Sequence, residues 1–292
     1  MSASGRKVRL PVIVRSIIVG LLIGMIAANV WPILLLKLGM PIAALAEVAF
    51  LAIYVWWVAG GGPPASLKAT RRDYFRVRAL SGAQWFWGVI AALSFAATIH
   101  AAIVLLFRLE PFPAAAFHRG YDFSFIPSRP MQWFACVISA LSAGVCEETG
   151  FRGYMQRPIE SRHGPAIAIF VSSLMFMLLH LTKDWALVGM VPIVFGAGVL
   201  LGILARASGT LVFCILGHWI MDVGLFAYWW TQIAGTFSQR PIAATGMDQA
   251  FWIECSTLIA VFVLLIISTA RLFALRNRTT APVSQTVSAA TV

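Results

Sequence analysis

The sequence has few charged residues, and few acidic ones in particular. Only 11% of its 292 residues are charged, and 11 residues are Asp or Glu. A soluble domain carries roughly a quarter charged residues, so this composition excludes an ordinary soluble domain. Hydrophobic residues make up 60% of the chain, and the mean hydropathy is +0.85. We therefore predict an all-α, polytopic transmembrane helix bundle.

Other absences narrow the function classes. The four cysteines all lie in apolar segments and none forms a C-x-x-C pair, so we predict neither a disulfide framework nor a cysteine metal site. The sequence has no glycine-rich phosphate loop, no internal repeat and no separate soluble domain. The net charge of the chain is +11, which is typical of a membrane protein whose basic loops face an anionic cytoplasmic leaflet. We therefore expect the lipid bilayer as its partner and no binding to nucleic acid.

Eight apolar stretches approach the roughly 20 residues that a helix needs to cross a bilayer. They are residues 11–36, 41–60, 83–107, 130–151, 165–182, 187–205, 209–231 and 249–273. The fifth and sixth are short. The first follows a basic start; because Arg15 interrupts the run, an uncleaved span is favoured over a signal peptide.

The distribution of basic residues predicts the orientation. With eight spans and a cytoplasmic N-terminus, sixteen of the 22 Lys and Arg residues face the cytoplasm. The six on the other side are Lys37, Arg108, Arg119, Arg129, Lys183 and Arg240. We therefore expect both termini in the cytoplasm. This count also places Glu147 and Glu148 near the cytoplasmic end of the fourth stretch.

Three smaller patterns add local detail. Ser81 and Gln84 form a capping box before the third stretch. The basic segment 66–80 is either a helix lying on the membrane surface or a loop that only fixes topology. Small residues at helical spacing, Gly196, Gly198 and Gly202, indicate close helix packing.

Two adjacent acids within an apolar stretch are the main indication of function. No charged residue lies between Met131 and Cys146, and Glu147 and Glu148 follow at once. Carboxylates at such a depth are costly to insert and are seldom without a use. Neighbouring helical residues point about 100° apart, so different roles are expected. Arg152 lies four residues after Glu148, at ion-pair spacing, which leaves Glu147 free to act on water as a general base.

Further polar residues offer partners. His218 and Asp222 are four residues apart on one helical face, so they can bind one metal together, or Asp222 can orient the imidazole. His180 alone is most simply a packing residue. Together these residues indicate a water-activating or metal-binding site, and the other interpretation is a structural charge cluster between helices. His100, Glu47 and Glu254 are expected to have structural roles.

The three motifs in order resemble those of the CPBP intramembrane proteases. They are Glu147-Glu148-x-x-x-Arg152 with Phe151 and Gly153, then Phe176-x-x-x-His180, then His218-x-x-x-Asp222. That family includes CAAX prenyl endopeptidases of the Rce1 type and "abortive infection" proteins, and the resemblance covers roughly residues 130–225. It divides the chain into N-terminal helices without a motif (1–129), a catalytic core (130–231) and a last helix with a disordered tail (232–292).

The resemblance implies an intramembrane endopeptidase that hydrolyses membrane-associated proteins or peptides. These substrates could be lipidated proteins of the CAAX type or other polypeptides. It would lie in the bacterial inner (plasma) membrane with its site toward the cytoplasm. Glu147 and His180 would activate water, Glu148 and Arg152 would support the site, and His218 with residue 222 would stabilise the oxyanion or complete the site. The family commonly has Asn where this chain has Asp222. Because an ionised Asp cannot donate a hydrogen bond, Asp222 is expected to orient His218 or bind a cation.

The sequence leaves the cofactor and two other functions open. A divalent metal such as zinc, held by Glu147, His180, His218 and Asp222, is one option. Because the sequence lacks an H-E-x-x-H helix, direct activation of water by Glu and His without a tightly bound metal is favoured. A proton-coupled carrier and a catalytically silent peptide-binding scaffold are the alternatives. The carrier is disfavoured by the absence of an inverted repeat, and the scaffold by the complete set of motif residues.

Overall fold

The computed structural model describes residues 10–119, 123–187 and 189–280, and within these ranges all regular structure is helical. The predicted disordered tail falls mostly on residues 281–292, which lie outside the described part. The elements are α1 Val12–Ala28, α2 Val30–Leu38, α3 Ile42–Val58, η1 Ala65–Leu67, α4 Lys68–Tyr74, α5 Gly82–Leu109, α6 Ala114–His118, α7 Arg129–Glu148, η2 Thr149–Met155, α8 Gln156–His163, α9 Pro165–His180, η3 Asp184–Leu187, α10 Met190–Ser208, α11 Val212–Gly224, η4 Leu225–Trp230, α12 Ile242–Thr245 and α13 Gln249–Thr280.

The apolar stretches predicted from the sequence all correspond to helices. Six helical segments of the described chain are long and apolar enough to cross a membrane, and α3 and α9 are shorter apolar helices. The prediction of an all-α transmembrane bundle is therefore confirmed, with the count of about eight spans as an approximation. The fourth stretch differs in length, because α7, η2 and α8 form one continuous run from Arg129 to His163.

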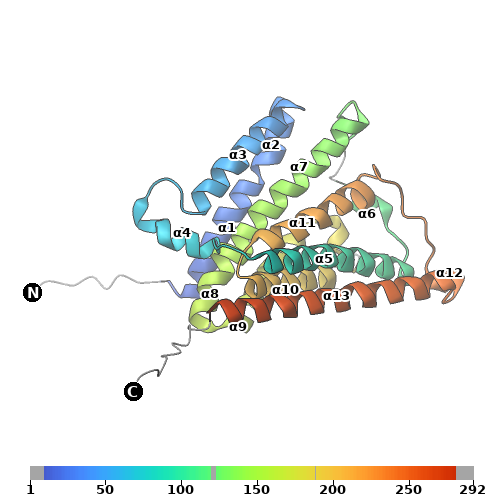
Figure 1. Cartoon of the computed structure of the whole chain (residues 1–292). Helices are drawn as coiled ribbons and strands as arrows, with labels where there is room; N and C mark the ends of the chain where they lie inside the picture. Colours follow the sequence, from blue (N-terminus) through green and yellow to red (C-terminus); the bar gives the residue numbers. More distant parts are fainter. Residues whose placement is uncertain (1–9, 120–122, 188, 281–292) are drawn as a thin grey trace, which may run out of the picture.

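The helices diverge from one end of the molecule. In Figure 1, α2, α3 and α7 lean together and separate from α5 and α13 with increasing distance from α8. α11 packs against both α5 and α7, α9 packs on α10, and α13 packs on α5 and α10. This arrangement places α11 between the two diverging groups.

The two ends of the bundle are formed by different elements. The α8 end comprises α4, α8, and the C-terminal ends of α10 and α13; there Arg76 bonds to Glu160 at 2.7 Å, and Arg276 donates to the carbonyl of Arg206. The α6 end comprises α6, the start of α7, the end of α9 and η4. At that end Arg129 donates to the carbonyl of Ile233.

Glycines bring the first helix against the middle of the α7–α8 run. A Cβ built on Gly150 would lie 2.7 Å from the carbonyl oxygen of Gly20 and 2.8 Å from the Cα of Gly24. The backbones of α1 and η2 therefore touch, which only glycine allows. The spacing Gly20-x-x-x-Gly24 is the small-residue pattern of transmembrane helix pairs. Of the predicted packing glycines, Gly198 and Gly202 make similar contacts, and Gly196 has open space around it.

The basic segment after α3 is attached to the bundle. Arg71 in α4 is buried and donates to the carbonyls of Trp57, Gly62, Pro63 and Pro64, while its guanidinium lies 4.8 Å from the Trp57 ring. The segment thus contains a short helix with a buried anchor, in agreement with the helical alternative, while its position on the membrane surface stays a prediction. The capping box of Ser81 and Gln84 forms at the start of α5, as predicted.

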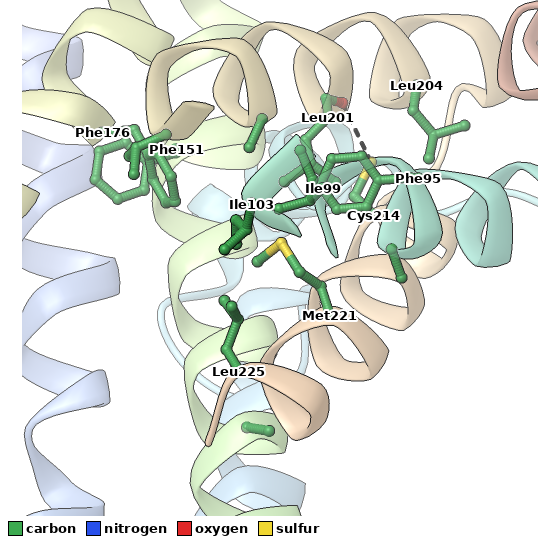
Figure 2. Close-up of a cluster of buried hydrophobic side chains, with 14 of the residues drawn as sticks. Phe95, Ile99, Ile103, Phe151, Phe176, Leu201, Leu204, Cys214, Met221 and Leu225 are labelled. Carbon is green, nitrogen blue, oxygen red and sulfur yellow. Dashed lines mark hydrogen bonds between the residues drawn. The ribbon is translucent and has the colours of Figure 1, made fainter. Parts of the chain in front are cut away.

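The main core lies where α5, α10 and α11 meet. Figure 2 shows Phe95, Leu201, Leu204 and Cys214 packed together, with Met221 and Leu225 further along α11 and η4. The Cys214 thiol donates to the carbonyl of Leu201 at 3.4 Å. This packed region fixes α11, which carries His218 and Asp222, against α5.

Candidate active site

Glu147 and Glu148 lie near the middle of a long helical run. The chain stays helical for fifteen residues after Glu148, to His163, so the two acids do not lie at the end of this helix. Their expected position near the cytoplasmic end of the span stays a prediction. The segment Thr149–Met155 directly after them is a π-helix. Such segments are frequent at functional sites.

Glu148 and Arg152 form a fully buried ion pair. Arg152 Nη1 donates to Glu148 Oε1 at 2.8 Å, and both side chains are 0% exposed. Arg152 also donates to the carbonyl of Gly198 at 3.2 Å and stacks over the Phe176 ring at 4.5 Å. A buried charge needs a partner and further hydrogen bonds to offset its desolvation. The pair predicted from the i, i+4 spacing therefore forms, and it also joins η2 to α10.

His218 contacts carboxylates through both ring nitrogens. Its Nδ1 lies 2.8 Å from Glu148 Oε1, so the same carboxylate holds Arg152 and His218. Its Nε2 lies 3.3 Å from Asp222 Oδ2 and 4.0 Å from Glu147 Oε2. Gly144 permits this approach of α7 and α11, since a Cβ there would come within 3.2 Å of the α11 backbone. The imidazole is thus oriented by Glu148 on one side and by Asp222 on the other.

His180 is held by the turn of α9 that precedes it. Its Nδ1 lies 2.8 Å from the carbonyl oxygen of Phe176. A carbonyl only accepts, so Nδ1 carries the proton and Nε2 of the neutral ring is an acceptor. The ring also contacts Phe176 and Trp185, at centroid distances of 4.6 and 5.9 Å. The Phe-x-x-x-His spacing therefore fixes the tautomer of His180 through the Phe176 carbonyl.

Two cavities meet at Glu147 and His180. The first, with about 630 Å³ of empty volume including its open part, lies between α5, α9, α10 and α11 and is also lined by His218 and Asp222. The second, about 1290 Å³ by the same measure, lies between α1, α2, α7 and the end of α9. Ala143, Glu147, His180 and Phe226 line both. Glu148 and Arg152 line neither, so of the adjacent acids Glu147 alone faces open space.

The six predicted site residues occupy one region, though in two layers. Glu147, His180, His218 and Asp222 line the first cavity, and Glu148 with Arg152 supports them from behind. Sequence reasoning missed several lining residues, Ala143, Trp185 and Phe226 among them. Ala143 is one helical turn before Glu147, and that spacing was the only available signal for it. Nothing local marked the two aromatic residues.

The other polar residues in spans have structural contacts. His100 Nε2 lies 3.0 Å from the carbonyl of Met221, and Trp229 donates to His100 Nδ1 at 3.3 Å. Glu47 in α3 accepts a hydrogen bond from Ser142 of α7 at 2.7 Å. Glu254 lies 3.5 Å from Arg108. These contacts join helices, and none of the three residues lines the cavities around Glu147.

The geometry of the described residues does not provide a ready metal site. No group of three or more His, Cys, Asp or Glu side chains in this part of the chain is arranged to hold an ion. Both nitrogens of His218 already face carboxylate oxygens, at 2.8 and 3.3 Å. The residues present therefore do not fit a preformed zinc site, and metal binding by Glu147, His180, His218 and Asp222 stays a prediction.

Residues 129–224 match the family described as type II CAAX prenyl endopeptidase, Rce1-like. Neither the curated proteins nor the solved structures gave a match. The matched segment begins with α7, ends with α11 and contains all six site residues. The match supports a likeness of this segment to the Rce1-like family of CAAX-type membrane endopeptidases, and the six apolar helices support an integral membrane protein.

Proposed function

We propose that the protein hydrolyses peptide bonds with a water molecule activated by Glu147 and His180. The observation that carries the proposal is the position of Glu147. It lines both cavities, and its Oε2 atom has no hydrogen-bond partner among the described residues. A carboxylate that lines a cavity and is not engaged by an arginine can accept a proton from water. Glu148 cannot take this role, because it is fully buried between Arg152 and His218.

The surrounding groups supply the remaining steps. Glu147 takes a proton from water, the hydroxide attacks the carbonyl carbon of the substrate, and the proton then passes from Glu147 to the leaving amine. His180 Nε2 is an acceptor that can hold the attacking water by a second hydrogen bond. His218 stands at 4.0 Å from Glu147 and can place its Nε2 group against the developing oxyanion. Asp222, Glu148 and Arg152 orient His218 and are positioning residues in this scheme.

The lining of the first cavity favours apolar substrate segments. Around Glu147 and His218 it consists mainly of aliphatic and aromatic side chains, including Ile103, Trp185 and Trp230. Removing such surface from water stabilises a bound apolar side chain by about 25 cal/mol per Å². We infer that a substrate residue next to the cleaved bond is apolar, and a lipidated CAAX-type substrate is one class that satisfies this.

The test is hydrolysis of fluorogenic peptides by the detergent-purified protein. We expect Glu147→Gln to lower kcat/KM by 10²- to 10⁴-fold, the usual contribution of a general base. Glu110→Gln is the matched control, because Glu110 is an exposed residue in the loop after α5, and it should keep full activity. A zinc chelator distinguishes direct activation by Glu147 from metal chemistry: we expect activity to persist in its presence.

Three results would contradict the proposal. Equal activity of Glu147→Gln and Glu110→Gln would remove Glu147 from the chemistry. Absence of hydrolysis by the folded wild-type protein, on peptides with and without a lipid group, would favour the carrier or scaffold alternatives. Loss of activity with the chelator alone, restored by zinc, would replace the glutamate scheme by a metal-dependent one at the same residues.

A further inference from the structure

Four arginines from separate parts of the sequence form a cluster at the α8 end. The arginine cluster consists of Arg76 and Arg78 in the loop before α5, Arg206 in the last turn of α10, and Arg276 near the end of α13. Glu160 of α8 lies among them, and its two oxygens bond to Arg76 and Arg206 at 2.7 Å each. Four positive charges and this one negative charge give the group a net charge of +3.

Two members of the cluster converge on the turn that follows α10. Gly209 has a φ of +69°, and a Cβ built on it would lie 2.6 Å from Arg78 Nη1 and 3.5 Å from Arg276 Nε. Arg78 donates to the carbonyl of Ser208 at 3.3 Å, and Arg276 donates to the carbonyl of Arg206. The two guanidinium groups therefore meet at one backbone turn, although they come from distant segments.

Capping of α10 accounts for only part of this arrangement. Cationic side chains are favourable beside the last carbonyls of a helix, but a guanidinium has five N–H donors. Arg78 uses Nε and Nη1, on the carbonyls of Ala79 and Ser208, and its Nη2 bonds to no described residue. In the described part of the chain no carboxylate lies within ion-pair distance of Arg78. Because like charges held together repel, an external anion would stabilise the cluster.

The cluster lies where membrane-spanning helices begin and end. α10 ends at Ser208, the apolar part of α13 ends at Asn277, and α5 begins at Gly82. In Figure 1, α13 runs along α5 and its C-terminal end lies close to α8. The ends of spanning helices lie at the level of the lipid headgroups. The groups that surround the cluster in a membrane are therefore headgroups.

Exposed apolar side chains near the cluster offer a surface for acyl chains. Trp85 in the first turn of α5 is 45% exposed, and tryptophan is enriched where a protein meets the membrane–water interface. On α13, Val263, Ile266 and Ile267 are exposed and precede Arg276 along the helix. A lipid can thus place its headgroup against the arginines and its chains against α13.

We propose that the arginine cluster binds the phosphate group of an anionic membrane lipid. The planar guanidinium fork matches phosphate oxygens and donates two hydrogen bonds to them. The net charge of +3 favours a headgroup with a net negative charge over a zwitterionic one, whose cationic part would be repelled. None of the four arginines lines the two cavities at Glu147, so this lipid is not the proposed peptidase substrate.

Thermal unfolding with added lipid tests this assignment. The detergent-purified protein is mixed with phosphatidylglycerol, or with phosphatidylcholine of the same acyl chains, at low ionic strength. We expect phosphatidylglycerol to raise the unfolding midpoint by about 5 °C more than phosphatidylcholine, because a ligand that binds only the folded state stabilises it. Arg78→Gln should lose most of this difference between the lipids. The matched control is Arg162→Gln, an exposed arginine at the end of α8, and it should keep the difference.

A purely structural role of Arg78 predicts a different pattern. Loss of a helix cap lowers the midpoint of Arg78→Gln by the same amount with either lipid, so only a lost difference between the lipids reports binding. Arg276→Gln is the second variant, with the same expected loss, and it serves if Arg78→Gln does not fold.

Three outcomes would overturn the proposal. The first is an equal midpoint of the wild-type protein in the two lipids. The second is an equal response of Arg78→Gln, Arg276→Gln and Arg162→Gln. The third is a full shift produced by inorganic phosphate without lipid, which would assign the cluster to a soluble anion. Unfolding requires no turnover, so the result is independent of whether the chain is a peptidase.

Discussion

The two adjacent glutamates have different surroundings, and we expect their roles to differ accordingly. Glu148 is fully buried, where it binds Arg152 and His218 through one oxygen. Glu147 is partly exposed and lines both cavities. The angle of about 100° between neighbouring helical residues is the origin of this division. One carboxylate thus orders the site while the other stays available for chemistry.

Replacement of Glu148 should mainly affect stability. In Glu148→Gln the buried Arg152 keeps its contacts with the Gly198 carbonyl and Phe176 but loses its counter-charge. Removing one member of a buried ion pair destabilises a protein by about 3–5 kcal/mol. We expect a clear fall in the thermal unfolding midpoint in detergent, with Glu147→Gln as the control that stays near wild type. An unchanged midpoint for Glu148→Gln would mean that the pair contributes nothing to the fold.

Replacement of Asp222 should separate its orienting role from a chemical one. Asp222 Oδ2 lies 3.3 Å from His218 Nε2. Partners of this kind change activity by about 10- to 100-fold when removed. We expect Asp222→Ala to lower kcat by that amount with little change in KM, and Asp222→Asn, which keeps a polar contact to the ring, to lose less. If Asn and Ala are equally impaired, the carboxylate charge itself is needed, as it would be for a cation ligand.

At the scale of elements, the contact between α1 and η2 links the N-terminal helices to the site. Gly150 is two residues after Glu148 and touches Gly20 and Gly24 through backbone atoms. A methyl group at position 150 must push α1 away, and overpacking of this kind costs about 1–3 kcal/mol. Gly150→Ala should therefore lower the unfolding midpoint. The matched control, Gly196→Ala in α10, has open space around it and should be neutral or stabilising. Equal destabilisation by both would show that the α1 contact is unimportant.

The start of α13 is held by a charge contact outside the membrane-spanning segments. Arg108 Nη2 donates to Asp248 Oδ1 at 2.6 Å, which lowers the pKa of the Asp248 carboxyl from its ordinary value of 3.8. A lowered folded-state pKa means that this stabilisation is present above that ordinary value and is lost as pH falls through the folded pKa. We expect hydrogen exchange at the first turn of α13 to rise below about pH 4. In Asp248→Asn, hydrogen exchange at this turn should be faster already at neutral pH. If exchange changes neither at low pH nor in Asp248→Asn, the contact between Arg108 and Asp248 does not anchor the start of α13.

Hydropathy located the membrane helices well, but it did not show that the fourth helix continues to His163. The apolar stretch ends at residue 151, and the helix continues through charged residues after it, among them Glu160. Glu160 is held between Arg76 and Arg206, from segments far away in the sequence. Arg152 has a partner within its own helix, which the spacing did reveal. The sequence thus predicted an ion pair when the two residues were one helical turn apart. It did not predict an ion pair whose partners came from different elements.

On the scale of the whole molecule, the three motifs converge because α11 packs between α5 and α7. The sequence indicated that Glu147, His180 and His218 act together, since each is a polar group whose insertion into an apolar stretch costs free energy. It could not indicate the shape of the space around them. That shape depends on the divergence of α2, α3 and α7 from α5 and α13 in Figure 1, and on the early end of α9. The side from which a substrate enters is therefore a property of helix lengths and angles rather than of the motifs.

Sealed membrane vesicles allow the direction of substrate entry to be measured as activity. A soluble, membrane-impermeant fluorogenic peptide is added to the outside of vesicles that keep the cellular orientation, and to inverted vesicles. Because the cavities open past the end of α9 and close toward the α8 end, we expect hydrolysis in the preparation that exposes the α6 end and little in the one that exposes the α8 end. Detergent should equalise the two, and Glu147→Gln vesicles should be inactive throughout. Higher activity in the preparation that exposes the α8 end would mean that the substrate reaches Glu147 from that end, through a path that Arg152 and Gln156 close in the described structure.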